Sequence, residues 1–371
     1  ADYPRVRSVL KEIESRDNLE LHIIVTGSHL LNEYGHSAQE ILDDGFKINK
    51  KVEMFEGDFD SPLGMAEASA RCTKGVAKAL SEINPDLVLI TVDRVETLAS
   101  ITAASLMNFP IAHIQGGEVT GTIDESIRHA VTKLSHIHFP ATADAAQRII
   151  MMGENKELVF NTGCPYIDEI KALKPAKLNY LAEKYNFDQS KQIVIFTQHS
   201  VTTEHEESLW QVERTIEALE TLSNIQIICF FSNTDVGGKK IIKRIEKQKN
   251  FVKIPNMLSH DFLSLMSYSS LMIGNSSAGI REAPSFELPV INIGTRQNGR
   301  LRAKNVIDVD HDTSKIKKAI DYCLNNNDFK KSLSNLKNPY GDGTAAKKIV
   351  DILENIKINR ELIQKKISYE I

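Results

Sequence analysis

Short apolar segments alternate with helical patterns along almost the whole of this 371-residue chain. The apolar segments are nearly continuous runs, which is typical of parallel strands that are covered on both faces. In the first half, the predicted strands span residues 21–26, 87–92, 111–115, 136–140 and 158–162. The helical patterns between them include one over residues 64–82. This alternation predicts an α/β fold built on parallel sheets.

The same alternation restarts after a charged stretch near residues 170–191. The predicted strands there span 193–197, 225–231, 271–274, 290–293 and 306–309, and the helices span 206–222, 239–247, 261–267, 313–326 and 343–356. A chain of this length can hold two cores. We therefore predict two Rossmann-like domains, over residues 1–168 and 169–356. The pattern leaves open which domain is capped by the last, polar helix, over residues 359–367.

The first residues predict a helix start, with Asp2 as its cap and Pro4 in its first turn. No strand precedes this helix in the sequence, although a doubly wound sheet normally begins with a strand, which is usually central. We therefore expect the first domain to lack its first strand here. About 10–15 upstream residues would supply that strand and its turn.

Composition argues against several classes of protein. The net charge of −4 argues against a dedicated nucleic-acid surface. No apolar run approaches the ~20 residues of a membrane span, and no signal peptide is recognised. The four cysteines are scattered, which predicts reduced packing residues in a cytoplasmic chain. Metal-ligand spacings, a nucleophile elbow and a Walker A loop are also missing, so neither a metal nor another cofactor is predicted.

A carboxylate and a cation end the predicted strand over residues 87–92. Asp93 and Arg94 follow it directly, and a helical pattern begins with Glu96 in its first turn. Asp93 and Glu96 would suit the helix dipole there. We favour another interpretation, in which Asp93 is a catalytic carboxylate and Arg94 a phosphate-binding cation, because ligands bind at the carboxyl ends of parallel strands.

The loop after the strand over residues 111–115 is the richest in titratable side chains. Five polar residues would lie within reach of one cleft: Gln115, Glu118, Asp124, Arg128 and His129. Thr122 and Glu125 form a capping box, which explains Glu125 but not Asp124. Asp124 has Arg128 as its i+4 partner on the predicted helix. For His129, a structural hydrogen bond and a role in the site are equally plausible.

In the second half, Gln198 and His199 follow the strand over residues 193–197, and we favour a ligand role for His199. Residues 274–282 follow the predicted strand that ends at residue 274. Many of them have small side chains, which lets backbone amides approach an anion. Glu282 could reach a ribose diol from there. An ordinary capped helix is the alternative, but the strand-end loop carrying Arg296 favours a phosphate site.

At these residues the chain resembles the hydrolysing UDP-N-acetylglucosamine 2-epimerases of sialic- and legionaminic-acid-type sugar biosynthesis. The resemblance covers nearly the whole chain, through residues 1–3, 26–29, 93–94, 116–118, 123–129, 163–165, 198–199, 274–282 and 294–297. It implies the GT-B class, with two Rossmann-like domains, the active site in the cleft between them, and a C-terminal helix (357–371) that completes the first domain. It also implies a UDP-sugar substrate and a homodimer or homotetramer.

The resemblance implies roles for particular residues. Asp93 and Asp124 match the catalytic acids, and Gln115 and His199 belong to the predicted catalytic group. The residues implied to hold the UDP are Arg94, His199, Asn233, Met257, Ser276, Ser277, Glu282 and Arg296. Three positions depart from the family pattern: Gln115 replaces a glutamate, Val92 a glycine and Ser200 a proline. Gln115 matters most, because an amide cannot relay a proton as a carboxylate does.

The implied reaction converts UDP-GlcNAc, or UDP-2,4-diacetamido-2,4,6-trideoxyglucose, to the free manno sugar and UDP. It passes through a 2-acetamidoglucal, to which water adds. Three alternatives remain from the sequence: a non-hydrolysing 2-epimerase, a GT-B glycosyltransferase, and a catalytically weak UDP-sugar binder. The last would follow if Gln115 abolishes the proton transfer.

Overall fold

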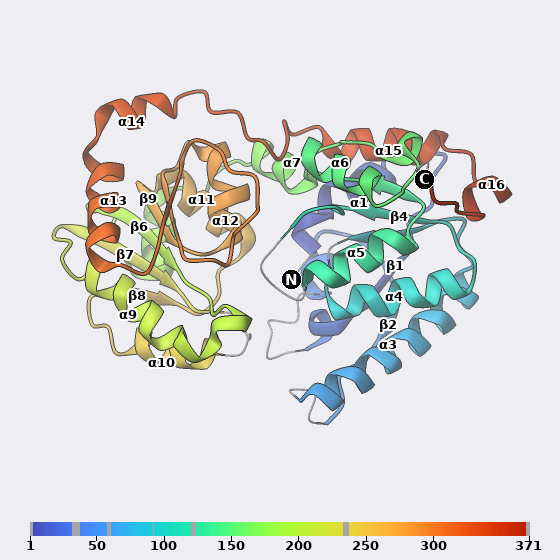
Figure 1. Cartoon of the computed structure of the whole chain (residues 1–371), viewed down its shortest axis with the longest axis horizontal. Coiled ribbons are helices and arrows are strands. Elements are labelled where there is room, and N and C mark those ends of the chain that lie inside the picture. Colours follow the sequence, from blue (N-terminus) through green and yellow to red (C-terminus); the bar gives the residue numbers. More distant parts are fainter. Residues whose placement is uncertain are drawn as a thin grey trace. The chain divides into compact units, whose positions relative to one another are not determined.

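A computed structural model describes residues 3–31, 38–57, 61–91, 93–119, 124–232 and 237–368, with only the backbone of Pro62, Asp124 and Thr202. The chain forms two compact units (Figure 1). The first unit comprises Ala1–Glu118, Ile123–Asp168 and Gly343–Ile371, and the second comprises Val119–Thr122 and Glu169–Asp342. Strands and helices alternate in both, which confirms the predicted α/β class.

The first unit holds two small parallel sheets, in the orders β1-β2 and β3-β4-β5. Its strands are β1 (Ile23–Thr26), β2 (Ile48–Val52), β3 (Val88–Thr91), β4 (Ile111–Ile114) and β5 (Ile137–Phe139). Its helices are α1 (Arg7–Glu14), α2 (Ala38–Asp43), α3 (Pro62–Ile83), α4 (Val95–Leu106), α5 (Asp124–Leu134), α6 (Ala143–Met151), α15 (Ala345–Asn355) and α16 (Arg360–Ile363). Short 3₁₀ turns lie at Tyr3–Arg5, Gly27–Leu30 and Lys156–Leu158, and α7 (Pro165–Lys171) contains the boundary after Asp168.

Helix α3 shows how local sequence sets the ends of an element. The Ser61 side chain accepts a hydrogen bond of 3.1 Å from the Gly64 amide, and Pro62 occupies the first turn, where no amide hydrogen is needed. Asn84 ends the helix in the left-handed region, with φ 49°. Asparagine tolerates that conformation better than most residues, so the helix stops there.

Helices cover both faces of the β3-β4-β5 sheet. On one face, Ile90 and Ile111 pack in a cluster with buried side chains of α3 and α4. On the other, Ala112 and Ile114 pack with Val9 of α1 and Ile349 of α15. Adjacent residues of β4 thus point into different cores, because successive side chains of a strand alternate between faces. This explains why β4 is apolar at consecutive positions.

The second unit holds one parallel sheet in the order β11-β10-β9-β6-β7-β8. Its strands are β6 (Gln192–Thr197), β7 (Ile225–Phe230), β8 (Phe251–Ile254), β9 (Leu271–Gly274), β10 (Val290–Ile293) and β11 (Val306–Val309). Its helices are α8 (Leu178–Tyr185), α9 (Ser208–Leu219), α10 (Gly238–Glu246), α11 (Ser259–Tyr268), α12 (Ser277–Arg281), α13 (Thr313–Asn325) and α14 (Asn327–Ser332), with 3₁₀ turns at Thr202–Glu207 and Ala283–Phe286. This is the Rossmann strand order, and its direction of winding reverses between β6 and β9.

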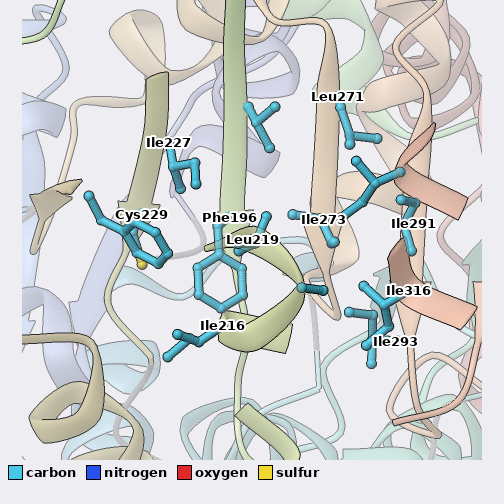
Figure 2. Packing of buried hydrophobic residues seen from close by; sticks show 14 of the residues in the cluster. Phe196, Ile216, Leu219, Ile227, Cys229, Leu271, Ile273, Ile291, Ile293 and Ile316 are labelled. Carbon is cyan, nitrogen blue, oxygen red and sulfur yellow. The ribbon is translucent and has the colours of Figure 1, made fainter. Parts of the chain in front are cut away.

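Figure 2 shows one core of the second unit. Phe196 of β6 lies among Ile216 and Leu219 of α9, with Ile227 and Cys229 of β7 to one side (Figure 2). Ile291, Ile293 and Ile316 extend the same cluster toward α13. Burying a side chain of this size is worth about 1.5–3 kcal/mol, so this packing stabilises the sheet on which the candidate site depends.

Some predicted elements differ from those observed. Residues 158–162 do not form a strand, because the segment leaves a 3₁₀ turn capped by Asn155 and joins β5 only through an isolated bridge from Val159 to His138. Strands β2 and β8 were not predicted. Both lie at sheet edges and carry lysines, so neither reads as a continuous apolar run. The helix predicted over 359–367 is shorter, at Arg360–Ile363, and the predicted cap Asp2 lies outside the described residues.

The compact units and the predicted domains share the boundary after Asp168. The chain re-enters the first unit at Gly343, whereas the sequence assigned residues up to 356 to the second domain. The reason is the packing of α15, whose Ile349 and Val350 belong to the core that contains Val9 of α1. Two hydrogen bonds from the start of α15 to Asp168 fasten it there, at 3.1 and 2.6 Å.

A buried carboxylate, Glu154, joins the end of the chain to the first unit. Its oxygens accept hydrogen bonds from Lys133 Nζ at 2.6 Å and His138 Nε2 at 3.1 Å, and Lys365 Nζ lies 2.6 Å away. Lys365 also donates to the backbone carbonyls of Thr132, Lys133 and Ser135 at the end of α5. Burial would raise the pKa of Glu154, but these three donors lower it from 4.5 to about 2.

Replacing Glu154 by glutamine should destabilise the protein by roughly 3 kcal/mol, because two ammonium groups lose their buried counter-charge. Since the folded pKa lies below the ordinary value, ionised Glu154 favours folding above about pH 4.5. That contribution is lost as the pH falls toward about 2. Urea unfolding at pH 7 and at pH 3 measures both effects. The exposed Glu157→Gln is the control, and equal losses in the two variants would contradict the prediction.

Candidate functional site

The candidate residues of the first unit begin at the carboxyl ends of β3 and β4. Asp93 follows β3, and its carboxylate is paired with the guanidinium of Arg128 on α5. The Arg128 side chain is only 3% exposed, and it also donates to the Glu118 carbonyl at 2.8 Å. A buried guanidinium with two fixed partners has little freedom to move. Arg128 therefore positions the Asp93 carboxylate.

Gln115 lies directly after β4 and is buried. Its backbone has φ 65°, a left-handed conformation that is uncommon for residues other than glycine, and its amide donates to the Phe139 carbonyl at 2.9 Å. The side-chain amide donates to Cys164 Sγ. Such a strained backbone persists only where its surroundings hold it, and strain of this kind clusters at functional sites.

The other predicted residues of the first unit are placed less completely. Asp124 is the first residue of α5, but its side chain is not described, and the predicted cap Thr122 lies outside the described residues. Arg128, the expected i+4 partner of Asp124, contacts Asp93, and its expected pairing with Asp124 is not tested because the Asp124 side chain is not described. His129 Nε2 lies 3.6 Å from Glu125 Oε1. Arg94 occupies the N-cap position of α4 without a side-chain capping hydrogen bond, and its side chain is 58% exposed.

In the second unit, the candidate loops follow β6 and β9, where the winding of the sheet reverses. Such a switch point is where ligands bind in open α/β sheets. Gly274 ends β9 with φ 127°, and a Cβ there would lie 1.9 Å from the Thr197 carbonyl oxygen. Only glycine fits without a shift of the backbone. The two loops therefore leave the sheet in close contact.

Asn275 joins these two loops through reciprocal hydrogen bonds. Its Oδ1 accepts from the His199 backbone amide at 2.7 Å, and its Nδ2 donates to the His199 carbonyl at 2.8 Å. Arg296 and Gln297 donate to the Asn275 carbonyl at 3.3 and 2.8 Å. Three loops are thereby held together, with a histidine and an arginine among them.

His199 is neutral near pH 7. Burial lowers the pKa of its imidazole from 6.5 to about 3, and the positive charge of Arg296 acts in the same direction. A neutral imidazole carries one N–H group, with which it can donate a single hydrogen bond to an anion, but it has no net charge. The fixed positive charge of this part of the site therefore comes from Arg296.

The remaining predicted UDP-binding residues lie in and around the loop after β9. Ser276 caps α12, its hydroxyl accepting from the Ala278 amide at 3.3 Å, and Ser277 begins the helix. Glu282 follows α12 and is buried. Met257 lies in the loop between β8 and α11 and is partly buried. Asn233 lies outside the described residues, so the structure does not test its predicted role.

Within the described residues, no three His, Cys, Asp or Glu side chains group in a way that could hold a metal ion. In the same part of the chain, no helix has the length and apolarity that crossing a membrane requires.

Comparison with known proteins identifies the family. Residues 11–354 match the model of the UDP-N-acetylglucosamine 2-epimerase family. A Legionella pneumophila protein named UDP-N,N′-diacetylbacillosamine 2-epimerase (hydrolyzing) is 37% identical over 370 residues, 98% of this chain and 96% of that protein. A Neisseria meningitidis UDP-N-acetylglucosamine 2-epimerase is 35% identical over 324 residues, 86% of this chain and 84% of that protein. The chain belongs to the UDP-N-acetylglucosamine 2-epimerase family.

The crystal structure of a UDP-GlcNAc 2-epimerase from Neisseria meningitidis, bound to UDP-GlcNAc, has the same fold. It superimposes with a TM-score of 0.84 over 95% of this chain and 96% of that one, at 20% identity. The predicted GT-B class, with two Rossmann-like domains, is confirmed.

Sequence reasoning did not assign roles to three residues that organise these loops. Arg128 was noted in its motif but paired with Asp124, and Asn275 and Gln297 were read only as parts of loop motifs. Arg128 and Asp93 are 35 positions apart, and Asn275 and His199 are 76 apart. Local periodicity carries no signal for pairs so distant.

Replacing Gly274 by alanine should lower the free energy of unfolding by at least about 2 kcal/mol, because the residue needs a positive φ and a methyl group would meet the Thr197 carbonyl. It should also weaken UDP binding, since the loops after β6 and β9 must separate. Denaturant unfolding and calorimetry with UDP measure the two effects.

Gly45→Ala is the matched control. Gly45 also has a positive φ, 92°, but a Cβ there would meet nothing within 4 Å. Gly45→Ala should therefore lose only the free energy of unfolding that comes from the positive φ, without a steric contribution. Equal losses of stability in the two variants would contradict the steric argument.

Proposed function

We propose that this chain is a hydrolysing 2-epimerase, which converts a UDP-linked 2-acetamido sugar to the free manno sugar and UDP. The observation that supports this most is the 37% identity, over 98% of the chain, to a relative named as hydrolysing. The substrate is UDP-GlcNAc or UDP-N,N′-diacetylbacillosamine, the sugar nucleotides in the names of the relatives.

The second unit supplies most of the groups that we assign to UDP, and Arg94 comes from the first unit. Breaking the bond between C1 and the phosphate oxygen leaves negative charge on the diphosphate. Arg296 would neutralise part of that charge, and neutral His199 would donate one hydrogen bond. One preorganised donor of this kind is commonly worth about 3 kcal/mol in the transition state. Ser276 and Ser277 complete this group, and Arg94, Asn233, Met257 and Glu282 are assigned to UDP through the resemblance.

The first unit supplies the groups that we assign to proton transfer. A carboxylate removes the proton from C2 while UDP leaves C1, which gives the 2-acetamidoglucal. Water then adds its hydroxyl to C1, and C2 receives a proton on the opposite face. Asp93 and Asp124 are the proposed acid and base. The contact with buried Arg128 supports Asp93 by keeping its carboxylate in one place.

Gln115 distinguishes an active enzyme from a UDP-sugar binder that has lost its chemistry. Its buried amide can orient a substrate group or a water but cannot exchange protons with C2. We propose that Asp93 and Asp124 suffice for the reaction and that Gln115 has a positioning role. UDP binding without turnover in the unaltered chain would favour the binder instead.

We expect Asp93→Asn and Asp124→Asn each to lower the release of manno sugar by about 10²–10⁴-fold, because each removes a proton-transfer group. Binding of UDP should change little, since neither carboxylate is assigned to it. Glu125→Gln, on the neighbouring residue, is the control and should retain activity. Unchanged turnover in both aspartate variants would contradict the assignment of Asp93 and Asp124 as the acid and base.

A product assay on both sugar nucleotides tests the function itself. Proton NMR of a mixture without any acceptor should show UDP and a free manno sugar. A product still linked to UDP would indicate a non-hydrolysing epimerase, and absence of reaction would favour a glycosyltransferase or a binder. The nucleotide that turns over with the larger kcat/KM identifies the sugar, because the two differ only at C4 and C6.

A further inference from the structure

Residues 163–165 are among the motifs on which the family resemblance rests, yet the proposed reaction does not use them. Cys164 lies between Gly163, which has φ 90°, and Pro165, the first residue of α7. Its side chain is buried. The sulfur accepts a hydrogen bond from a polar group, the side-chain amide of Gln115. The other three cysteines pack in apolar clusters: Cys72, Cys229 and Cys323.

The backbone of the loop after β4 is fastened to three neighbouring elements. The Gln115 backbone amide donates to the Phe139 carbonyl of β5 at 2.9 Å. Arg148 of α6 donates to the Gly117 carbonyl, and Arg128 of α5 donates to the carbonyl of the next residue at 2.8 Å. With its backbone held in this way, Gln115 can change direction mainly by rotation about its side-chain bonds.

Close packing keeps the loop on this path. Gly117 has φ 78°, and a Cβ there would lie 2.3 Å from the Ala145 carbonyl oxygen of α6. Gln115 shares the positive φ, at 65°, although it has a side chain. Such a conformation persists only where the surroundings impose it. The direction in which the Gln115 side chain leaves the backbone is therefore fixed by the fold.

The contact with Cys164 restricts the remaining freedom of the Gln115 side chain. A glutamine amide has two different ends, the donor Nε2 and the acceptor Oε1, and half a turn exchanges them. Because Nε2 donates to the Cys164 sulfur, Oε1 is turned away from it. The contact therefore selects an acceptor as the end that faces away from the thiol. An acceptor recognises hydroxyl and amide hydrogens, and a 2-acetamido sugar carries both.

We propose that Cys164 is a positioning residue of the site. It holds the Gln115 amide so that Oε1 accepts a hydrogen bond from a hydroxyl or the acetamido N–H of the bound sugar. This role rests on the proposed function, because it concerns the sugar of the UDP-sugar. It adds the loop before α7 to the ends of β3 and β4, which supply Asp93 and Gln115.

The test compares Cys164→Ala, which removes the sulfur, with Cys164→Ser, whose hydroxyl can accept the same hydrogen bond. The substrate is the sugar nucleotide that the unaltered chain turns over. Cys164→Ala should lower kcat/KM by about tenfold or more, because the reacting sugar loses its fixed orientation. Cys164→Ser should recover most of that loss. The dissociation constant of UDP should be unchanged in both variants, since the contact concerns the sugar.

A double-mutant cycle separates positioning from packing. Because Cys164 acts through Gln115, Cys164→Ala should lower kcat/KM no further in a chain that already carries Gln115→Ala. Cys72→Ala serves as the comparison. Cys72 is also buried in the first unit, and its sulfur lies 3.5 Å from a polar atom, Thr26 Oγ1. Any loss of thermal stability in Cys72→Ala should come without a loss of kcat/KM.

Three results would overturn the proposal: an unchanged kcat/KM in Cys164→Ala, a serine variant as slow as the alanine variant, or the same loss from Cys164→Ala with and without Gln115→Ala. If the unaltered chain turns over neither sugar nucleotide, the proposed reaction is wrong, and calorimetry then tests the positioning role by itself. Cys164→Ala should weaken the binding of UDP-GlcNAc and leave that of UDP unchanged. Unchanged affinity for UDP-GlcNAc would refute the role of Cys164.

Discussion

The burial of parallel strands on both faces is the constraint on which the rest of this protein depends. Once helices cover both faces of a sheet, as they cover β4, polar groups can reach a ligand only beyond the ends of the strands. The candidate residues follow this rule. Asp93 and Gln115 come after β3 and β4, and His199 and Asn275 come after β6 and β9.

Buried charges in the first unit serve two different purposes. Glu154 is surrounded by Lys133, His138 and Lys365, a structural network that holds the end of the chain against α5 and β5. Arg128 is equally buried, yet it is directed at Asp93, a carboxylate at a strand end that remains partly exposed. The exposure of the carboxylate distinguishes the two arrangements: the Glu154 side chain is 1% exposed, whereas the Asp93 side chain is 24% exposed, and a substrate must reach a catalytic group.

The sequence predicted those elements whose pattern is local and strong. Every interior strand was found, because a continuous apolar run signals burial on both faces. Edge strands β2 and β8 were missed, since half of an edge strand faces water and tolerates lysine. The helix α15 was predicted from the sequence, but the unit to which it belongs was not. Its place is set by the packing of Ile349 against α1 and β4, which involves residues far apart in the chain.

The sequence by itself determined the α/β class, the positions of the strand ends and the chemical groups that follow them, because these depend on periodicity and residue type over a few positions. Tertiary structure alone decided which groups meet. It directed Arg128 to Asp93 and tied Asn275 to the backbone of His199. Contacts of this kind depend on how strands are ordered in a sheet, which local sequence does not encode.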